Sequence, residues 1–335
     1  MEWIEPLIAW YKKNARDLPW RRTNDAYAIW VSEIMLQQTR VAAVLPYYER
    51  FMRELPDVTA LSRVSGEKLH KLWEGLGYYS RANNLKRAAC EIVAAHEDGM
   101  PRTYEELLKL PGIGAYTAGA VASIAFGEAV PAIDGNVLRV YARLTASERD
   151  VRDPAYKKEV RAAIAPLVPE SGPGEFNAAL MELGALVCLP GGAPKCGECP
   201  VRPYCRAFAL GKTAELPKVG KKPARKIEQK TVFVLAENGR PVGYRRPETG
   251  LLAGLWQLPD TAGTLRDSEA ADWLGARGLH PAGELRFYTR KHIFTHIEWH
   301  MRVCAAEIAE AQLPEGWVLL DETHALPTAY RVCLQ

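Results

Sequence analysis

Apolar residues recur with helical spacing through the first part of the chain. Stretches such as residues 26–52 and 115–127 show this spacing, and prolines and glycines interrupt it at intervals of one helix length. No sustained alternation of apolar and polar positions occurs over residues 1–187. We therefore predict that this part of the chain is all-α.

The pattern becomes typical of strands after residue 228. Residues 230–236 are rich in β-branched and aromatic side chains, an Asn-Gly pair follows, and a second strand-like stretch occupies residues 241–246. Residues 285–308 alternate strongly, and one helical stretch, 267–278, precedes them. This order predicts a small α+β domain.

A basic segment with two prolines separates the two patterns. Residues 217–226 carry five bases and no acid, so they bury little surface. The chain up to residue 227 has a net charge of +6, and the remainder has −3. We expect domains at 1–215 and 228–335, joined by a linker at 216–227 that acts as a tether or also touches an anionic polymer.

Composition limits the class of protein. The chain has 335 residues, 48% apolar and 25% charged, which is ordinary for a globular protein and agrees with two domains. This excludes disordered, collagen-like and fibrous chains, and no apolar stretch of about 18 residues predicts a membrane span. The N-terminal residues include acids where a secretion signal needs bases, so we expect an intracellular protein.

A glycine-containing turn forms the first local motif. The segment 107–124 predicts a helix ending near Leu110, a tight turn, and an apolar helix from about Ala115. The turn consists of Pro111, Gly112, Ile113 and Gly114. Its glycines let the backbone approach a ligand and leave N–H groups at a helix N-terminus, which suits a phosphate. An ordinary corner between two helices is the alternative.

Two acidic residues lie in contrasting surroundings. Glu33 lies within the apolar stretch 28–37, so we expect a buried carboxyl with a raised pKa, the alternative being an acid at the helix edge. Asp134 precedes a helix, where the ionised form is favoured and a plain N-cap is the alternative role. Two carboxyls whose pKa values are pushed apart permit general acid catalysis beside a permanent anion, which suits cleavage of an N-glycosidic bond.

Four of the seven cysteines fall within 18 positions. They are Cys188, Cys196, Cys199 and Cys205. In a reducing compartment this spacing indicates metal ligands rather than disulfides. Zinc held by four thiolates and a 4Fe–4S cluster both agree with it.

Several segments, in order along nearly the whole chain, resemble the helix-hairpin-helix DNA glycosylases. Within that superfamily they are most similar to the adenine DNA glycosylases of the MutY type. The segments are 16–22, 31–40, 75–85, 110–120, 133–137, 181–188, the cysteine loop 188–205, 250–259 and 292–299. The resemblance implies a multi-domain protein: an all-α helix-hairpin-helix glycosylase domain with a 4Fe–4S cluster loop, followed by an α+β Nudix-like domain.

The same resemblance implies an enzyme that excises adenine mispaired with 8-oxoguanine or G in double-stranded DNA. The adenine would leave the stack to reach the site. Glu33 matches the acid that protonates the adenine, and Asp134 matches the carboxylate that stabilises the cationic sugar, directly or through a covalent intermediate. Tyr116 and Asn136 match supporting positions in that catalytic site.

Further positions match residues that bind substrate in this family. In the family's adenine pocket, the matching residues of this chain are Trp20, Arg21, Leu36 and Glu182, with Arg16 as a weaker candidate. At the positions that wedge into the base stack, they are Gln37, Gln38 and Tyr78. In the loop that recognises 8-oxoguanine, they are Phe294, Thr295 and His296.

Residue 116 sets the subclass that the resemblance implies. Related glycosylases of the endonuclease III type have a lysine at this position, which forms a Schiff base and cleaves the strand. Because Tyr116 has no amine, we expect a monofunctional enzyme that leaves an abasic site.

The chain departs from the family pattern at two places. Seven residues separate Cys188 from Cys196 where six are usual, and Thr295 stands where a serine is usual. The segment 260–278 also lacks the Arg-Glu-x-x-Glu-Glu pattern of the Nudix hydrolases, so we expect this domain to recognise the lesion without hydrolysing a nucleotide.

Two alternative functions remain. One is another helix-hairpin-helix glycosylase, acting on oxidised pyrimidines or T·G mispairs; the other is a non-catalytic lesion-binding protein. The intact Glu33 and Asp134 speak against the second. The expected protein is a bacterial, cytoplasmic, nucleoid-associated monomer that has DNA as its partner and no membrane association.

Overall fold

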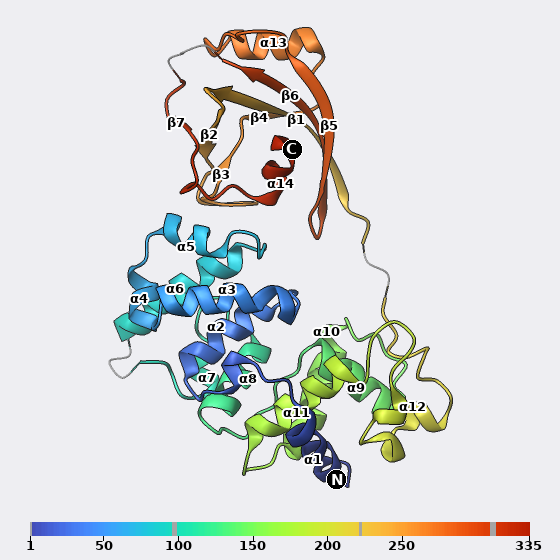
Figure 1. Cartoon of the computed structure of the whole chain (residues 1–335). Helices are drawn as coiled ribbons and strands as arrows, with labels where there is room; N and C mark the ends of the chain where they lie inside the picture. Colours follow the sequence, from blue (N-terminus) through green and yellow to red (C-terminus); the bar gives the residue numbers. More distant parts are fainter. Residues whose placement is uncertain (1, 96–98, 221–222, 309–312) are drawn as a thin grey trace. The chain divides into compact units, whose positions relative to one another are not determined.

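The computed structural model describes residues 2–95, 99–220, 223–308 and 313–335. Contacts divide the chain into two compact units (Figure 1). The first contains residues 1–63 and 84–221, and the second contains residues 64–83 and 222–335. Each unit is described by itself below.

Helices build the first unit, as the apolar spacing predicts. They are α1 (Ile4–Asn14), α2 (Ala26–Leu36), α3 (Val41–Glu54), α4 (Val58–Arg63), α7 (Tyr104–Leu107), α8 (Ala115–Ala125), α9 (Gly135–Thr145), α10 (Pro154–Ile164), α11 (Pro173–Leu186) and α12 (Arg206–Ala209). A further helix, α6 (Ser80–Ala95), crosses the division between the units.

The stretch 26–52 forms two helices rather than one. α2 ends at Leu36, and α3 begins at Val41. Between them Gln38 adopts a φ of +56°, a left-handed conformation that cannot continue an α-helix. Local apolar spacing continues across this break, so it did not reveal the turn.

Helix α2 runs through the interior of the first unit. Its residues from Ala26 to Met35 are all buried, which is expected for a helix that is apolar on every side. The side chain of Asp25 caps its N-terminus by accepting a hydrogen bond from the Tyr27 amide at 3.0 Å. Glu33 is therefore carried into an apolar interior by the helix that bears it.

A second core lies where α9, α10 and α11 meet. Phe176, Leu180 and Leu183 of α11 pack there with Val137 and Val140 of α9. These residues recur every three or four positions, which places them on one face of each helix. The core therefore fixes α9, which has Asp134 at its N-cap, and α11, which carries Glu182.

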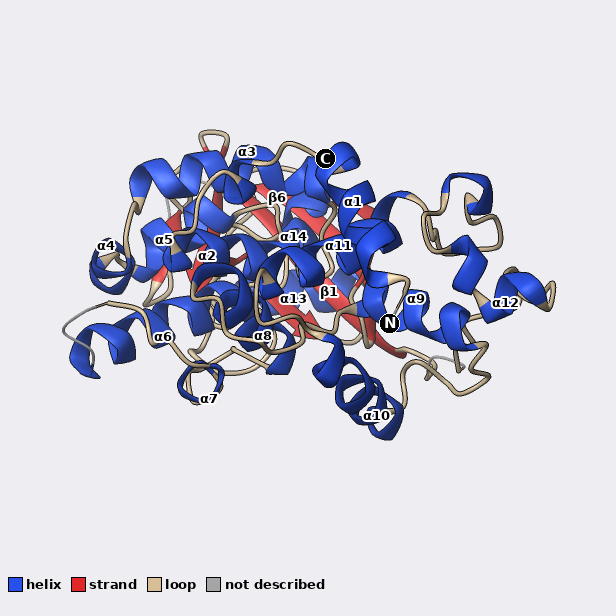
Figure 2. Cartoon of the chain, turned by 90° about the horizontal axis from the view of Figure 1, so that it is seen from below, coloured by secondary structure: helices blue, strands red, loops and turns tan. Residues whose placement is uncertain are grey.

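A mixed sheet forms most of the second unit, which also contains α5 (Gly66–Trp73). The strand order is β3-β2-β1-β6-β5, with β4 paired to β1 and β7 paired to β2. The strands, red in Figure 2, are β1 (Lys226–Glu237), β2 (Arg240–Arg245), β3 (Trp256–Gln257), β4 (Asp260–Ala262), β5 (Arg286–Ile293), β6 (Ile297–Glu307) and β7 (Trp317–Leu319). β1 and β6 run parallel, and the other pairs are antiparallel.

Both faces of this sheet are covered. Phe233 of β1 stacks on Trp273 of α13 (Asp267–Gly275), with ring centroids 4.0 Å apart. On the other face, Trp299 of β6 packs against Tyr330 of α14 (Thr328–Arg331). Alternate residues of the strands thus enter two separate cores, as period-two alternation predicts. The predicted fold class, a helical domain followed by an α+β domain, is confirmed.

Candidate functional site

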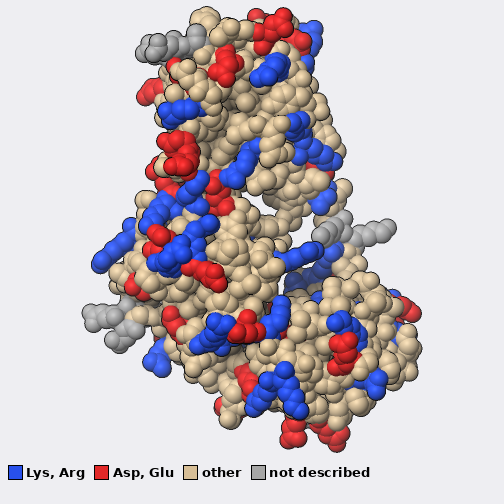
Figure 3. All heavy atoms as spheres, in the orientation of Figure 1, with Lys and Arg blue, Asp and Glu red and all other residues tan. Residues whose placement is uncertain are grey.

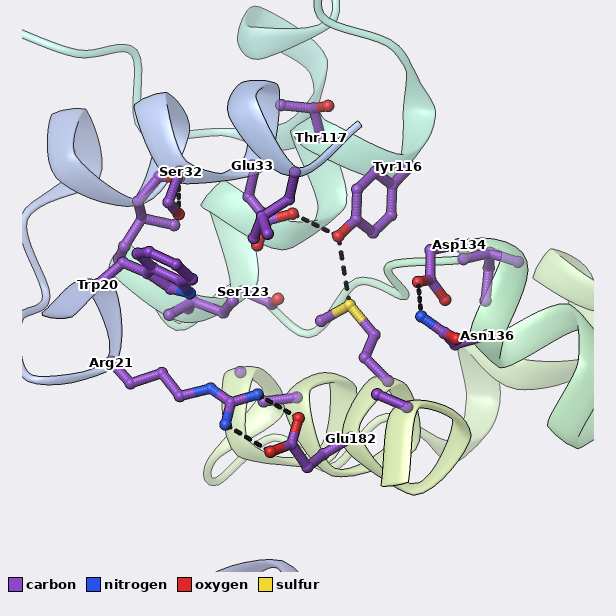
Figure 4. A pocket seen from close by; sticks show the side chains of 18 of the residues that line it. Trp20, Arg21, Ser32, Glu33, Tyr116, Thr117, Ser123, Asp134, Asn136 and Glu182 are labelled. Atoms are coloured by element: carbon purple, nitrogen blue, oxygen red, sulfur yellow. Dashed lines mark hydrogen bonds and ion pairs between the residues drawn. The ribbon is translucent and has the colours of Figure 1, made fainter. Parts of the chain in front are cut away.

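A cleft of about 1550 Å³ lies within the first unit. Residues from α2, α8, α9 and α11 line it, and Figure 4 shows their side chains from close by. Glu33, Tyr116, Asp134 and Asn136 are all among the lining residues. The structure therefore brings the four residues predicted to be catalytic to one cleft.

Glu33 faces the cleft from α2 with only 6% of its surface exposed. The hydroxyl of Tyr116, at the start of α8, donates a hydrogen bond to Glu33 Oε2 and lies 3.3 Å from the sulfur of Met181 (Figure 4). Burial raises the pKa of Glu33 to about 7, and the charge of Asp134 adds to this, while the Tyr116 hydrogen bond acts against it. A carboxylic acid with this pKa can donate a proton near neutral pH.

Asp134 caps the N-terminus of α9. Its Oδ1 accepts a hydrogen bond from the Val137 amide at 2.8 Å, and its Oδ2 accepts one from Asn136 Nδ2 at 2.7 Å. Burial raises the pKa of Asp134, although these hydrogen bonds and the charge of Arg139 act to lower it.

The contrast between the two carboxyls that the sequence predicts lies in their hydrogen-bond donors rather than in burial. Burial raises the pKa of both Glu33 and Asp134, because the cleft removes both carboxyls from water. The difference between them is in their donors: the Val137 amide, the side-chain and backbone amides of Asn136 and the charge of Arg139 favour the ionised form of Asp134.

Arg139 connects Asn136 to the cysteine loop. Its Nη2 donates to Asn136 Oδ1 and to the Gly184 carbonyl, both at 2.8 Å, and its Nε donates to the Cys188 carbonyl at 2.7 Å. Sequence reasoning missed this residue. Its only signal was a basic residue one helical turn beyond Asn136 on a helix that starts at the site.

Glu182 anchors an arginine pair at the cleft. It is 1% exposed, and both Arg16 and Arg21 bind it with two charge-assisted hydrogen bonds each, at 2.6–2.9 Å. Burial alone would raise the pKa of Glu182, but the arginine hydrogen bonds lower it to about 2. Arg16, the weaker candidate in the sequence, is thus as firmly held as Arg21.

Two residues predicted for the adenine pocket and two predicted for the wedge lie around the same cleft. Trp20, Leu36, Gln37 and Gln38 all line it. Trp20 is buried edge-to-face against Tyr48, with ring centroids 5.1 Å apart. Gln37 Nε2 lies 3.4 Å from the Thr117 hydroxyl, beside the start of α8.

The turn before α8 has a geometry in which its backbone could bind a ligand. Thr103 and Glu106 cap α7 reciprocally, which fixes the first helix of the hairpin. Gly112 adopts a φ of +76°, and a Cβ there would lie 2.6 Å from the Asn84 side chain. Gly114 caps α8, and open space surrounds the place where its Cβ would be. On the face drawn in Figure 3, Lys and Arg are interspersed with Asp and Glu, so the charge of that face does not mark one DNA-binding surface. The glycine-containing turn is therefore a more specific candidate for contact with DNA.

Four further predicted residues belong to the second unit and are not among those that line the cleft. Tyr78 is 45% exposed and has a φ of +50°. Phe294, Thr295 and His296 form the turn between β5 and β6. The carbonyl of His296 accepts a hydrogen bond from the Lys226 amide at 3.0 Å, which holds the turn against the start of β1.

None of the four clustered cysteines takes part in a disulfide, and their sulfurs influence one another electrostatically. Burial raises the pKa of Cys199 to about 11, and the other three sulfurs add to this. The Arg143 guanidinium, on a residue only 2% exposed, donates to Cys188 Sγ at 3.2 Å. Among the described residues, no three His, Cys, Asp or Glu side chains are arranged to hold a single metal ion. A buried cation beside these sulfurs fits a thiolate-ligated, negatively charged cluster.

Two family models cover most of the chain. A model described as HhH-GPD superfamily base excision DNA repair protein matches residues 31–170, and a NUDIX domain model matches residues 231–335. A solved structure of a thermostable thymine-DNA glycosylase is 28% identical, with a TM-score of 0.57, over 62% of this chain and 95% of that one. Fold and site therefore define a base-excision repair glycosylase with a NUDIX domain.

Curated relatives narrow this class. The adenine DNA glycosylase of Homo sapiens is 35% identical, over 97% of this chain and 72% of the relative. That of Arabidopsis thaliana is 38% identical over 98% of this chain, which spans 60% of its length. The chain belongs to the adenine DNA glycosylases, enzymes of base excision repair that hydrolyse an N-glycosidic bond, as the sequence predicted. No helix in the described residues is long and apolar enough to cross a membrane.

Proposed function

We propose that the chain excises adenine paired with 8-oxoguanine or G in double-stranded DNA and leaves an abasic site. The observation that carries this proposal is that one cleft holds both the buried Glu33, to which the Tyr116 hydroxyl donates, and Asp134, to which Asn136 donates; burial raises the pKa of Glu33 to about 7. One group supplies a proton at neutral pH, and the other supplies negative charge where the sugar becomes cationic.

The reaction begins at Glu33. Its carboxyl donates a proton to a ring nitrogen of the flipped adenine, and the bond from sugar C1′ to the base nitrogen breaks with its electron pair going to adenine. The Asp134 carboxylate stabilises the resulting oxocarbenium ion by its charge. Water then adds to C1′ and returns a proton to Glu33, which restores the starting state.

Neighbouring groups prepare the two carboxyls for these steps. The Tyr116 hydroxyl holds the Glu33 carboxyl in one orientation, and Asn136 does the same for Asp134. Tyr116 is a phenol, so it cannot form the Schiff base that a lysine at this position would form. This supports a monofunctional enzyme.

Specificity for the mispair is assigned to three groups of residues. Trp20, Arg21, Leu36 and Glu182 bind the adenine in the cleft. Gln37, Gln38 and Tyr78 wedge into the base stack. Phe294, Thr295 and His296 read the opposite 8-oxoguanine, and the turn at 111–114 holds a phosphate through its backbone.

We infer that Cys188, Cys196, Cys199 and Cys205 hold a 4Fe–4S cluster. Their closeness in the loop 188–205 and the buried Arg143 guanidinium, which donates to Cys188 Sγ, support such a site. The cluster would crosslink the loop 188–205. Arg139 hydrogen-bonds the Cys188 carbonyl and thereby ties this loop to the N-terminal turn of α9.

The test uses labelled duplexes with A opposite 8-oxoguanine, A opposite G, A opposite T, and T opposite G. Each is incubated with protein and then divided for treatment with or without hot alkali. We expect cleavage only after alkali, fastest for A opposite 8-oxoguanine and absent for A opposite T. Cleavage of the T·G duplex would instead indicate a thymine glycosylase. Strand breaks without alkali would contradict the role given to Tyr116, and tight binding without any release would indicate a binding protein.

A further inference from the structure

The segment that delivers Asp134 to the cleft has no regular structure. Residues 127–134 connect α8 to α9, and no helix or strand is assigned to them in the described chain. Pro131 and Ala132 are nonetheless buried. Buried backbone groups outside helices and sheets need other hydrogen-bond partners, and here side chains supply them.

Asn177, on α11, is the principal partner. It is 0% exposed. Its Nδ2 donates to the Val130 carbonyl at 2.9 Å, and its Oδ1 accepts from the Ala132 amide at 3.0 Å. One side chain thus satisfies a carbonyl and an amide two residues apart, as a neighbouring strand would. The second hydrogen of Nδ2 is donated to the Ser123 hydroxyl at 2.9 Å, which aligns the amide.

Two other contacts restrict the same segment. Arg161 of α10 donates to the Pro131 carbonyl at 3.1 Å. Gly119 of α8 lies so close that a Cβ there would be 2.3 Å from the Pro131 oxygen. The two peptide groups between Val130 and Ala132 are therefore held from α8, α10 and α11 together.

The position of Asn177 on α11 is also informative. Asn177, Met181 and Gly184 are spaced by four and three residues, so they share one face of the helix. Met181 contacts the Tyr116 hydroxyl that bonds Glu33, and a Cβ at Gly184 would lie 2.5 Å from the Asn136 side chain. This face of α11 contacts the supports of both catalytic carboxyls.

We propose that Asn177 is a positioning residue for the glycosidic reaction, which places the Asp134 carboxylate by fixing residues 130–132. The proposal rests on the proposed function, because it assigns Asp134 its catalytic role. Asn177 itself hydrogen-bonds to the segment before Asp134 and not to the carboxylate. Loss of its hydrogen bonds moves the carboxylate relative to the sugar, and displacements of this kind reduce rates by about 100-fold.

The test compares Asn177→Leu and Asn177→Asp with Tyr27→Phe. Leu removes all three hydrogen bonds, whereas Asp keeps the shape and the contact to the Ala132 amide but cannot donate to Val130. Tyr27→Phe is the matched control, because the buried Tyr27 hydroxyl also donates to a backbone carbonyl, that of Leu55, at 2.8 Å in the same unit.

We expect both Asn177 variants to release adenine about 100-fold more slowly in single turnover, with duplex affinity changed by less than about twofold. The acid limb of their pH–rate profile should move to higher pH, because a displaced Asp134 loses donors that favour its ionised form. Tyr27→Phe should also lower the thermal stability, because it leaves the Leu55 carbonyl without this donor, but it should keep the rate and profile of the original chain. Equal slowing in Tyr27→Phe, or an unchanged rate in both Asn177 variants, would overturn the proposal.

Hydrogen exchange separates this proposal from the proposed function. We expect the Ala132 amide to exchange faster in the Asn177 variants, while the amides of α9 beyond its first turn stay protected. An unchanged exchange rate at the Ala132 amide would show that Asn177 does not fix residues 130–132, and it would overturn the proposal whatever the rate of adenine release. If the unsubstituted chain releases no adenine but the Ala132 amide loses protection in the variants, Asn177 still fixes this segment, and the proposed function is the part that fails.

Discussion

At the scale of single residues, burial sets the protonation state of the candidate acid. Glu33 is carried by a helix that is buried on all sides, and this raises its pKa to about 7. The Tyr116 hydrogen bond orients the carboxyl without restoring its ordinary pKa. The residue therefore keeps its proton under conditions where exposed carboxyls have lost theirs.

The first prediction concerns pH. Because Glu33 acts in its protonated form, the single-turnover rate of adenine release should fall as pH rises through about 7, with a tenfold loss per unit above it. The rate should be measured from pH 5 to 9 with a duplex that contains A opposite 8-oxoguanine and with protein in saturating excess over the duplex. A rate that keeps rising up to pH 9 would exclude Glu33 as the acid.

The second prediction is that Glu33→Gln abolishes adenine release and also stabilises the folded protein. The folded pKa of about 7 lies above the ordinary glutamate pKa of 4.5, so the folded state binds more protons than the unfolded state between these values, and its stability falls as pH rises through that window. Replacing the carboxyl with an amide removes this loss. At pH 8 we expect a gain of up to roughly 3 kcal/mol, read as a higher urea midpoint, and no release of adenine. At pH 4 the gain should disappear.

The third prediction concerns the arginine pair at Glu182. Glu182→Gln leaves Arg16 and Arg21 partly buried beside a neutral amide, which should cost about 2 kcal/mol, less than a fully buried pair because both arginines reach solvent. Adenine release should slow as the pocket loses its anchor. The exposed pair of Lys212 and Glu148 supplies the control, since Glu148→Gln should change the free energy of unfolding by less than about 0.5 kcal/mol.

At the scale of elements, α9 joins the site to the cysteine loop. Its first turn holds Asp134, and one turn later Arg139 bridges Asn136 and the Cys188 carbonyl. Arg143, a further turn along, reaches the Cys188 sulfur. One short helix therefore connects the cysteine loop to the cap that holds Asp134.

The fourth prediction tests this link. Arg139→Leu removes the hydrogen bonds to Asn136, Gly184 and Cys188 while keeping an apolar stem in place. We expect slower adenine release together with weaker retention of iron on dialysis against a chelator. Arg149→Leu, which removes exposed ion pairs at Asp153 and Glu159, is the control and should change neither. Loss of activity with iron fully retained would show that the link runs through Asn136 alone.

Local pattern predicted the elements better than the contacts between them. The helices at 26–36 and 115–125 and the alternating strands follow from apolar spacing, and Glu33 and Asp134 follow from their immediate neighbours. Asn177 and Arg139 do not, because the backbone groups that they bond, at Val130 and Ala132 and at Gly184 and Cys188, lie 45–49 residues away along the chain. Their roles depend on how α9 and α11 pack, which single-sequence spacing does not contain.

At the scale of the whole molecule, contacts group residues 64–83 with the C-terminal residues rather than with the helices around them in sequence. That segment contains Tyr78, assigned to the wedge, and the C-terminal residues contain the turn at 294–296, assigned to lesion reading. Chain order alone suggested a simple boundary near residue 216. A division that interrupts the helical sequence arises from long-range contacts, which local composition cannot show.

The fifth prediction assigns recognition of the opposite base to the second unit. Because His296 lies in an exposed turn outside the residues lining the cleft, His296→Ala should leave the rate for A opposite G unchanged and lower the preference for 8-oxoguanine over G. His280→Ala, an exposed histidine after α13, makes the same chemical change elsewhere in that unit and should alter neither rate. Both variants keep the cleft intact, so a loss of activity on both duplexes would place His296 in catalysis rather than recognition. If His296→Ala and His280→Ala show the same preference for 8-oxoguanine over G, then His296 does not recognise the opposite base. That preference would then have to arise from Gln37, Gln38 and Tyr78, the residues assigned to the wedge.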